Sequence, residues 1–519
     1  MKKFTTHFLS ILLGVLVLFG FSLESKAQQT PDVSSITGRL VRITPKLADI
    51  DPNTMYGEPL PIMRDMNGII VNGSGDFARN KRETKRKLEE ELRNSALGIK
   101  TEAIQEENLI FPNVPGTSIG TTIVGQTSPG LSPTDNNIAV GPNHVIQMVN
   151  NTSGSFIKIW NKAGAVVQNS ITLASITGFA GSGDPIVLYD QLANRWLLSE
   201  FGPNFASCCN QLIMAVSTTA DPTGTWSVYQ YIDVSFFPDY PKYSVWHNAY
   251  YATTNDFNAS GTSYLGSSVW AFNRTAMLAG AATAVMVRSR QTGAGNMFYY
   301  MGTVGLEGNT TSSQNGLFIV PSPPTTLNIF EVTPDFVTPG ITVGPLLPLT
   351  IAAFSSPPVS VAQQGTGTII NTLGHRMMFK LNYRNNSGTE SIVLTHTVGN
   401  GALAAVRWYE LRRVAAVWTV FQQGTITGAD GNSRFMGGIS MDGCGNIALM
   451  YDKSGTTSFP SIVYTGRNAA DPLNTMTLAE ATIINGTTFH TNSRWGDYNT
   501  TVQDYPNNNS FWSTSQHSN

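Results

Sequence analysis

A phrase repeated between Asp184 and Trp512 constrains the fold of this chain more than any other feature. Each copy has an Asp or Arg, a Gly or Pro, a short alternating apolar run, a turn, and a second run that ends in an aromatic residue. Alternation with period two is typical of β-strands, and Gly and Pro recur too often for helices of ordinary length. Such a unit, repeated at intervals of roughly 50 to 75 residues, predicts four-stranded blades of a β-propeller.

Counting the copies gives six or seven blades, so the predicted fold is an all-β propeller. Copies begin near Asp135, Asp184, Asp239, Phe298, Arg376, Arg434 and Arg494. Several blades are predicted to end in a strand that carries a tryptophan, as at Trp226 and Trp418. A strand from residues 119–124 is expected to pair with the last strand near Trp512 and close the ring, because an open ring leaves a strand edge unpaired.

The N-terminus predicts export. Lys2 and Lys3 precede an apolar stretch at 8–21, and Ser25 and Ala27 are small residues at the positions that a signal peptidase inspects. Residues 1–27 therefore read as a signal peptide cleaved after Ala27. No later window holds the roughly 18 apolar residues of a membrane-spanning helix. A secreted or cell-surface protein without a membrane span is expected.

Residues 28–110 differ from the rest of the chain and are interpreted as a linker or pro-region. Their densest charge lies at 79–93, where Glu83 and Lys87 have the i,i+4 spacing of a solvated helix. The predicted organisation is therefore a signal peptide (1–27), a short helical linker (28–110) and a propeller (111–519).

Composition excludes several classes of partner. Charged residues make up 13% of the chain and the net charge is −2, so no basic field attracts nucleic acid. Cys208, Cys209 and Cys444 cannot form a disulfide framework, and the seven histidines lack metal-ligand spacing. No metal site or cofactor is predicted. Ca²⁺ is the one ion left open, because several aspartates lie in turns rich in backbone carbonyls: Asp184, Asp190, Asp442 and Asp452.

Residues 374–512 carry a resemblance to a known family. The segments are Gly374-His375-Arg376, Val406-Arg407-Trp408-Tyr409 and Arg494-Trp495-Gly496-Asp497-Tyr498, together with Gly183-Asp184-Pro185 nearer the N-terminus. They resemble a largely uncharacterised family of secreted bacterial β-propeller proteins, similar in outline to the sialidase-like superfamily, and the export signal resembles those of Bacteroidetes. The resemblance implies fold and location but no reaction. The Phe-Arg-Ile-Pro sequence of sialidases is missing.

The start of each blade's first strand supplies the candidate site, because these positions converge on one mouth of a propeller. Asp135, Asp184 and Asp239 come from the first half of the chain, and Arg376, Arg434 and Arg494 come from the second. Their sequence neighbours add further candidates: Lys242, His375, Asp497 and Tyr498.

Two interpretations of this mouth compete, and a third, a calcium site or a glycan-binding mouth without turnover, lies between them. In a glycan-active enzyme, a sialidase-like hydrolase or a polysaccharide lyase, Asp184, Asp239 and Tyr498 would be catalytic. The ligand would be held by Arg376, Arg434, Arg494, Asp497, Lys242 and His375. In the alternative, the acids and arginines pair with one another and fix the hub, because unpaired buried charges are costly.

The sequence favours a binding or adhesion module without established catalysis. The expected partner is an extracellular glycan or another cell-surface component, and a monomer is expected. A purely structural surface protein is the third class.

Overall fold

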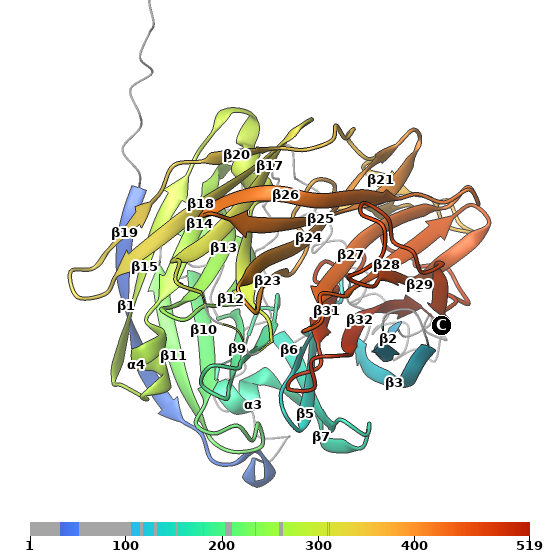
Figure 1. The fold of residues 1–519 in the computed structure, drawn as a ribbon. Helices are drawn as coiled ribbons and strands as arrows, with labels where there is room; N and C mark the ends of the chain where they lie inside the picture. The colour runs from blue at the N-terminus through green and yellow to red at the C-terminus, as the bar shows by residue number, and fades with distance from the viewer. Residues whose placement is uncertain are drawn as a thin grey trace, which may run out of the picture. The chain divides into compact units, whose positions relative to one another are not determined.

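Antiparallel sheets of four consecutive strands recur through the computed structural model (Figure 1). It describes residues 32–50, 105–114, 118–128, 132–151, 154–179, 181–202, 210–233, 235–258, 263–308, 310 and 312–518. Contacts divide the chain into Met1–Asp32 and Val33–Asn519, and the sheets belong to the second unit. The predicted signal peptide, the charged helix at 79–93, and Cys208 with Cys209 lie outside the described residues.

The first three sheets follow one another along the chain. The first consists of β4 (Asn137–Val140), β5 (His144–Asn151), β6 (Gly154–Asn161) and β7 (Val166–Thr172), followed by the short helix α3 (Leu173–Thr177). The second consists of β8 (Ile186–Asp190), β9 (Arg195–Phe201), β10 (Asn210–Ser217) and β11 (Trp226–Asp233). The third consists of β12 (Phe236–Val245), β13 (Tyr250–Asn258), β14 (Tyr264–Phe272) and β15 (Thr283–Gln291), with α4 (Arg274–Leu278) between its last two strands.

Three further sheets follow the same pattern. After the 3-10 helix η4 (Ala294–Tyr300) come β16 (Gly302–Leu306), β17 (Gly316–Ser322), β18 (Thr326–Asp335) and β19 (Gly340–Val343), and β20 (Leu347–Thr350) also pairs with β18. The next four strands are β23 (Leu381–Asn386), β24 (Thr389–Asn400), β25 (Leu403–Val414) and β26 (Val417–Ile426). β23 pairs in parallel with β16, so this group and the preceding one are joined into one larger sheet. The one after it has β27 (Ser433–Met441), β28 (Ile447–Gly455), β29 (Ser458–Arg467) and β30 (Ala481–Ile484).

The last sheet combines strands that lie far apart in the sequence. Its order is β3 (Ser118–Ser128), β2 (Gln105–Val114), β32 (Phe511–Ser518) and β31 (Thr500–Gln503). The last strand therefore pairs with β2, in a register that places Leu109 opposite Thr514. Residues 119–124, from which a closing strand was expected, do belong to this sheet as part of β3, but they pair with β2, and β2 is the direct partner of the last strand.

The first strands of these sheets form a closed ring. β4, β8, β12, β16, β23, β27 and β31 lie next to one another in that order, and β31 contacts β4. The seven sequence phrases begin within or shortly before these strands. The all-β class is confirmed, and sheets arranged radially around a ring are the architecture of a β-propeller.

Inner and outer strands of a sheet differ in how deeply their side chains are buried. The inner strand β12 is buried along its whole length because sheets cover it on both sides. The outer strand β7 is mostly half-buried or exposed, and it carries the polar run Gln168-Asn169-Ser170. Trp226 in β11 and Trp418 in β26 are buried, as expected for aromatic residues that close a sheet.

Strand β1 (Asp32–Ile43) lies between β11 and β15 and joins two neighbouring sheets. It pairs with β11, with Arg39 opposite Gln230, and the backbone N–H of Leu40 donates to the carbonyl oxygen of Ala282. The 3-10 helix η1 (Leu47–Asp49) follows it. Both β1 and most of β2 fall within residues 28–110, and the boundary between linker and propeller at residue 110 stays a prediction.

The segment 351–380, which connects β20 to β23, packs over the end of the ring where the inner strands begin. It contains the hairpin β21 (Ser360–Val361) and β22 (Ile370–Asn371), and the N–H of Asn371 donates to the carbonyl oxygen of Ser493 at 2.8 Å. The side chain of Gln363 donates to the carbonyl oxygen of His490 at 2.9 Å. Leu373 and Phe379 are buried in the same apolar cluster as residues of the inner strands. This segment therefore covers the mouth that the sequence selects.

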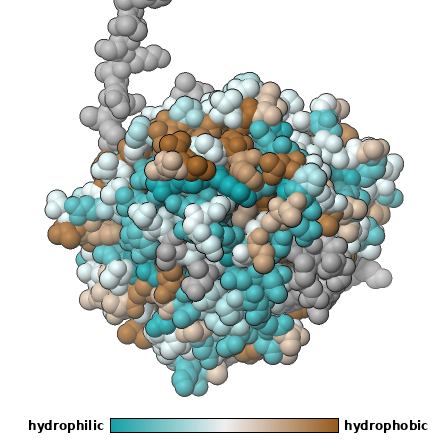
Figure 2. All heavy atoms as spheres, in the orientation of Figure 1, coloured by the Kyte–Doolittle hydropathy of each residue, from teal (hydrophilic) through white to brown (hydrophobic). Residues whose placement is uncertain are grey.

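Apolar side chains also reach the surface on outer strands. Figure 2 shows them gathered in the region where Figure 1 places β18, β20 and β26. Leu347 in β20 and Val417 in β26 are both more than half exposed. Among the described residues, no helix is long and apolar enough to cross a membrane.

Candidate functional site

The backbone turns through an uncommon conformation where several inner strands begin. Asp135, Asp184, Tyr240, Met436 and Asp497 have φ angles of 49°, 51°, 52°, 50° and 80°. Aspartate is among the residues that tolerate this left-handed region best. The turns are also joined to one another, because the N–H of Asp135 donates to the carbonyl oxygen of Gly496 at 3.0 Å. The repeated Asp in the sequence phrases therefore marks a recurring turn at the strand entry.

Polar side chains from these turns form one connected network. The hydroxyl of Tyr498 donates to Asp184 Oδ2 at 3.1 Å, and the hydroxyl of Tyr240 donates to the carbonyl oxygen of Asp497 at 2.8 Å. Asn150 in β5 bridges two of the acids. Its Nδ2 donates to Asp135 Oδ2 at 2.6 Å, and its Oδ1 accepts the N–H of Asp184 at 3.1 Å.

Cations complete the network. The guanidinium of Arg494 forms a salt bridge with the carboxylate of Asp497. Lys242 lies with its Nζ 4.4 Å from the centre of the Tyr240 ring and donates to the carbonyl oxygen of Met377 at 2.7 Å. Met377 belongs to the covering segment 351–380, so Lys242 ties that segment to β12.

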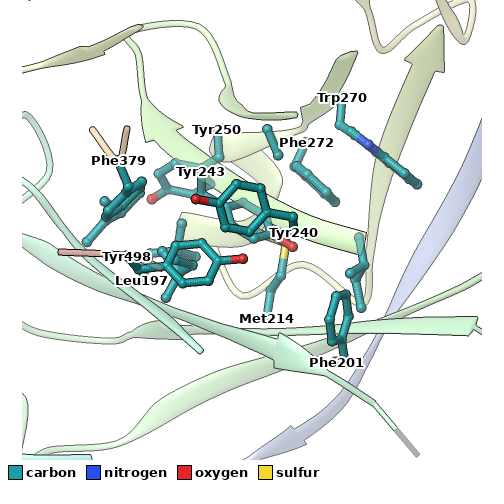
Figure 3. Packing of buried hydrophobic residues seen from close by; sticks show 14 of the residues in the cluster. Leu197, Phe201, Met214, Tyr240, Tyr243, Tyr250, Trp270, Phe272, Phe379 and Tyr498 are labelled. Atoms are coloured by element: carbon teal, nitrogen blue, oxygen red, sulfur yellow. The ribbon is translucent and has the colours of Figure 1, made fainter. Parts of the chain in front are cut away.

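The network is closed to solvent. Asp184, Asp497 and Tyr498 are 0% exposed, and Arg494, Lys242 and Asp239 are at most 4% exposed. Aromatic rings pack beside it. The Tyr240 and Tyr498 rings lie 4.9 Å apart, and Phe379 lies 6.2 Å from Tyr498 (Figure 3). A substrate has no access to these residues while the segment 351–380 stays in place.

Burial also sets the protonation of the network. It raises the pKa of the Asp497 carboxyl, against the opposing effect of Arg494, and it raises the pKa of the Tyr498 hydroxyl well above its usual range, with a further rise from Asp184. It lowers the pKa of the Lys242 ammonium well below its usual range. A tyrosine nucleophile must lose its proton, and the raised pKa of Tyr498 opposes that loss.

Arg434 does not join this network. It lies in β27, and its guanidinium forms salt bridges with Asp430 at 2.6 Å and Glu480 at 2.9 Å. Both partners belong to the sheet of β27–β30 or to the turn before it. The structure therefore does not bring the three arginines of the predicted clamp together.

His375 lies in the covering segment and not among the acids. Its Nε2 is 3.1 Å from the hydroxyl oxygen of Ser356, and its ring lies 5.5 Å from Phe354. Burial lowers the pKa of His375, and the positive charge of Arg376 lowers it further. A neutral, packed imidazole fits this environment.

Arg376 differs from the other two arginines. It is half-buried, its guanidinium carbon lies 4.6 Å from the centre of the Tyr299 ring, and its Nη2 donates to the Tyr299 hydroxyl at 2.9 Å. The carboxylate of Asp497 is close enough to act on the charge of Arg376, so Arg376 lies at the edge of the network. It has no salt bridge with any described residue.

Three contributors to this region escaped the sequence analysis: Asn150, Tyr240 and Tyr299. A signal for Tyr240 was present, because an Asp-Tyr pair occurs both at Asp239-Tyr240 and at Asp497-Tyr498. Asn150 and Tyr299 had no comparable signal. They lie in a second strand and in η4, at positions that the repeated phrase does not mark.

The described residues contain no group of three or more His, Cys, Asp or Glu side chains placed to hold a metal ion. The aspartates considered for Ca²⁺ have protein partners instead. Asp190 accepts hydrogen bonds from Arg274 and Tyr250, and Asp442 accepts the backbone N–H groups of Cys444 and Asn446. Cys444 itself is exposed and free.

No family model and no curated protein matches this chain. Solved structures match only remotely. Trypanosoma rangeli sialidase has 7% identity over 69% of this chain and 56% of its own, with a TM-score of 0.29. The WD40 domain of Toxoplasma gondii coronin has 8% identity over 80% and 88%, with a TM-score of 0.31. Phage phi92 endosialidase has 8% identity over 80% and 69%, with a TM-score of 0.30. Scores this low carry no argument about function.

Proposed function

We propose that this chain is an exported binding module that recognises an extracellular glycan and catalyses no reaction at the ring mouth. The proposal rests on the salt bridges and the burial of the predicted arginines and acids. Arg494 and Arg434 are held in salt bridges, and Asp184, Asp497 and Tyr498 are fully buried. A buried ion pair such as that of Arg494 with Asp497 fixes neighbouring elements, and breaking it leaves an uncompensated charge. In this proposal the mouth is a hub.

The same proposal includes the blade number and the export. Each four-stranded sheet would be one blade, which gives seven blades, and the sheet of β31, β32, β2 and β3 would be the closing one. Residues 1–27 would be removed on export. The chain would then be related to secreted β-propeller proteins of Bacteroidetes. The glycan class is supported by a surface of neutral polar groups, because only 13% of the residues are charged, and by half-buried tyrosines at Tyr264, Tyr299 and Tyr300.

One hydrogen bond supports a second candidate function, that of a glycan-active hydrolase. Tyr498 and Asp184 lie within hydrogen-bond distance of each other, as a tyrosine nucleophile and its activating carboxylate would. For this candidate, the segment 351–380 would have to move away from Asp184 and Tyr498 before substrate could enter.

The test is a glycan-array screen of residues 28–519, followed by product analysis for every glycan that binds. The hub proposal expects binding without cleavage, and Tyr498→Phe should bind as the wild type does. Cleaved product that disappears in Tyr498→Phe would establish the hydrolase instead. A folded wild-type protein that binds no glycan would refute both, and would leave a protein partner or a purely structural role.

A further inference from the structure

Arg376 is a cation with unused hydrogen-bonding capacity. A guanidinium has five N–H donors. Among the described residues, that of Arg376 makes one hydrogen bond, from Nη2 to the hydroxyl of Tyr299, and no salt bridge. By contrast, the guanidinium of Arg434 makes five hydrogen bonds, to Asp430, Asn432 and Glu480. Arg376 is also half-buried, whereas Arg494 is only 3% exposed.

The side chain of Arg376 is nevertheless held in place. Its guanidinium stacks on the Tyr299 ring at 4.6 Å. The backbone beside it is anchored as well, because the N–H of Met377 donates to the carbonyl oxygen of Tyr300 at 3.0 Å. A fixed guanidinium loses less conformational entropy when it binds a ligand than a mobile one does. The arrangement is therefore prepared for an anion.

Aromatic rings surround this position. The Tyr264 and Tyr299 rings lie 5.3 Å apart, and the Tyr299 and Tyr300 rings lie 5.9 Å apart, both edge to face. All three tyrosines are half-buried. Tyrosine offers an apolar face and a hydroxyl on one side chain, which suits stacking against a sugar ring together with hydrogen bonding to its hydroxyl groups.

The carboxylate nearest to Arg376 already has a cationic partner. Asp497, whose charge acts on Arg376, forms a salt bridge with Arg494. A planar carboxylate matches the two parallel N–H groups of a guanidinium. Free Nε and Nη1 donors beside a tyrosine surface fit a ligand that carries both a carboxylate and a sugar ring.

We propose that Arg376, Tyr299 and Tyr300 form a binding site for a carboxylate-bearing sugar unit, with the carboxylate on the guanidinium and the ring against the tyrosines. This inference rests on the proposed glycan function and names its ligand class and its place. Arg376, Tyr299 and Tyr300 are half-buried, whereas Asp184, Asp497 and Tyr498 are fully buried. In this proposal a ligand therefore reaches the site while the ring mouth stays closed.

The test uses two acidic probes, the trimers of galacturonic acid and of glucuronic acid, each paired with its own carboxyl-reduced, neutral form. Binding to residues 28–519 is measured by calorimetry. The wild type should bind at least one acid trimer about tenfold or more tightly than its neutral form, because a hydrogen-bonded charge pair is lost on reduction. This comparison needs no variant and is unaffected by folding defects.

The variants then place the site. Arg376→Met should lose the preference for the acidic trimer. Arg376→Lys should lose most of it, because lysine keeps the positive charge but lacks the two parallel N–H donors of a guanidinium. Arg195→Met is the matched control. Arg195 is a half-buried arginine whose guanidinium bonds the carbonyl oxygens of Ala193 and Asn194. It should bind as the wild type does.

Two results would separate the inference from the function on which it rests. If the wild type binds neutral and acidic forms equally, or if Arg376→Met keeps the preference, the inference is overturned while the glycan function stands. If the folded wild type binds no glycan on the array, both are overturned.

Discussion

The free energy of unfolding of the wild type should fall as the pH rises, because Asp452 is buried, and replacing Asp452 with Asn should remove this fall. Asp452 lies in β28 and is fully buried. Its Oδ2 accepts hydrogen bonds from Trp495 Nε1 at 3.0 Å and Asn499 Nδ2 at 2.6 Å, and its Oδ1 accepts one from the Ser515 hydroxyl at 2.7 Å. Burial raises the pKa of Asp452 to about 7, against the opposing effect of these three donors.

The sign of the effect follows from the two pKa values. In the unfolded chain the pKa of an aspartate is about 3.9. Between that value and about 7 the native state keeps a proton that the unfolded state has lost, so stability falls as the pH rises. Each pH unit is worth about 1.4 kcal/mol, so the three units amount to about 4 kcal/mol.

Asparagine can reproduce the hydrogen bonds of the protonated acid. Its oxygen can accept from Trp495 and Asn499, and its amide can donate to the hydroxyl oxygen of Ser515. The assay is urea unfolding of wild type and Asp452→Asn at about pH 4 and about pH 8. The free energy of unfolding of the variant, relative to wild type, should rise by about 4 kcal/mol between these pH values.

A control is Gly367→Ala, because this change involves no ionisable group and the added Cβ would have open space around it. Its stability relative to wild type should stay constant across the same range. If the relative stability of Asp452→Asn changes by less than about 1 kcal/mol, the assignment of a protonated, buried Asp452 is wrong.

Three further changes test other parts of the fold. His396 is fully buried 3.0 Å from the Tyr409 hydroxyl, and burial lowers its pKa well below the usual value. The His396 imidazole is therefore neutral in the native state, and the free energy of unfolding decreases as the pH falls below about 6.5. His396→Gln should reduce this pH dependence in the same urea series, and an unchanged pH dependence would refute the assignment. Arg467→Met should cost about 2 to 4 kcal/mol in thermal unfolding, because the buried guanidinium bonds the carbonyl oxygens of Asp471, Pro472 and Thr475. An unchanged melting temperature would contradict that role. Gly38→Ala should cost about 1 to 3 kcal/mol, because an added Cβ would lie 2.2 Å from the buried Tyr231 ring, while Gly367→Ala, with open space around it, should be neutral.

The sequence predicted the β-sheet class and the start of each sheet because both depend on local pattern. Period-two alternation marks strands, and the turn residues Asp184 and Asp497 adopt a backbone conformation that aspartate tolerates. The closing sheet was harder to predict. β2 begins at Gln105, within residues 28–110, which were interpreted as a linker because of the dense charge at 79–93. Its pairing with β32 is a contact between opposite ends of the chain, which no local pattern reports.

The candidate site could be predicted in part for a related reason. The repeated phrase placed Asp184, Asp239, Lys242, Arg494, Asp497 and Tyr498 at one end of the ring, and they do lie in one buried network or beside it. It also equated Arg434 with Arg494, although Arg434 stands two residues before the left-handed turn at Met436 and Arg494 stands three before the turn at Asp497. In extended chain a shift of one residue turns a side chain to the opposite side. Arg434 accordingly meets Asp430 and Glu480, and Arg494 meets Asp497.

The covering segment decides what the network can do, and its role is invisible in the sequence. Residues 351–380 have little regular structure, yet Gln363, Asn371 and Met377 bond groups from three other parts of the ring. Once the segment is in place, Tyr498 and Asp184 lose contact with solvent, and a pair that could act as nucleophile and base becomes part of a hub. Arg376 is carried by the same segment and stays half-buried beside Tyr299. One stretch of chain therefore closes the ring mouth and presents, at its edge, the arginine that keeps donors for a ligand.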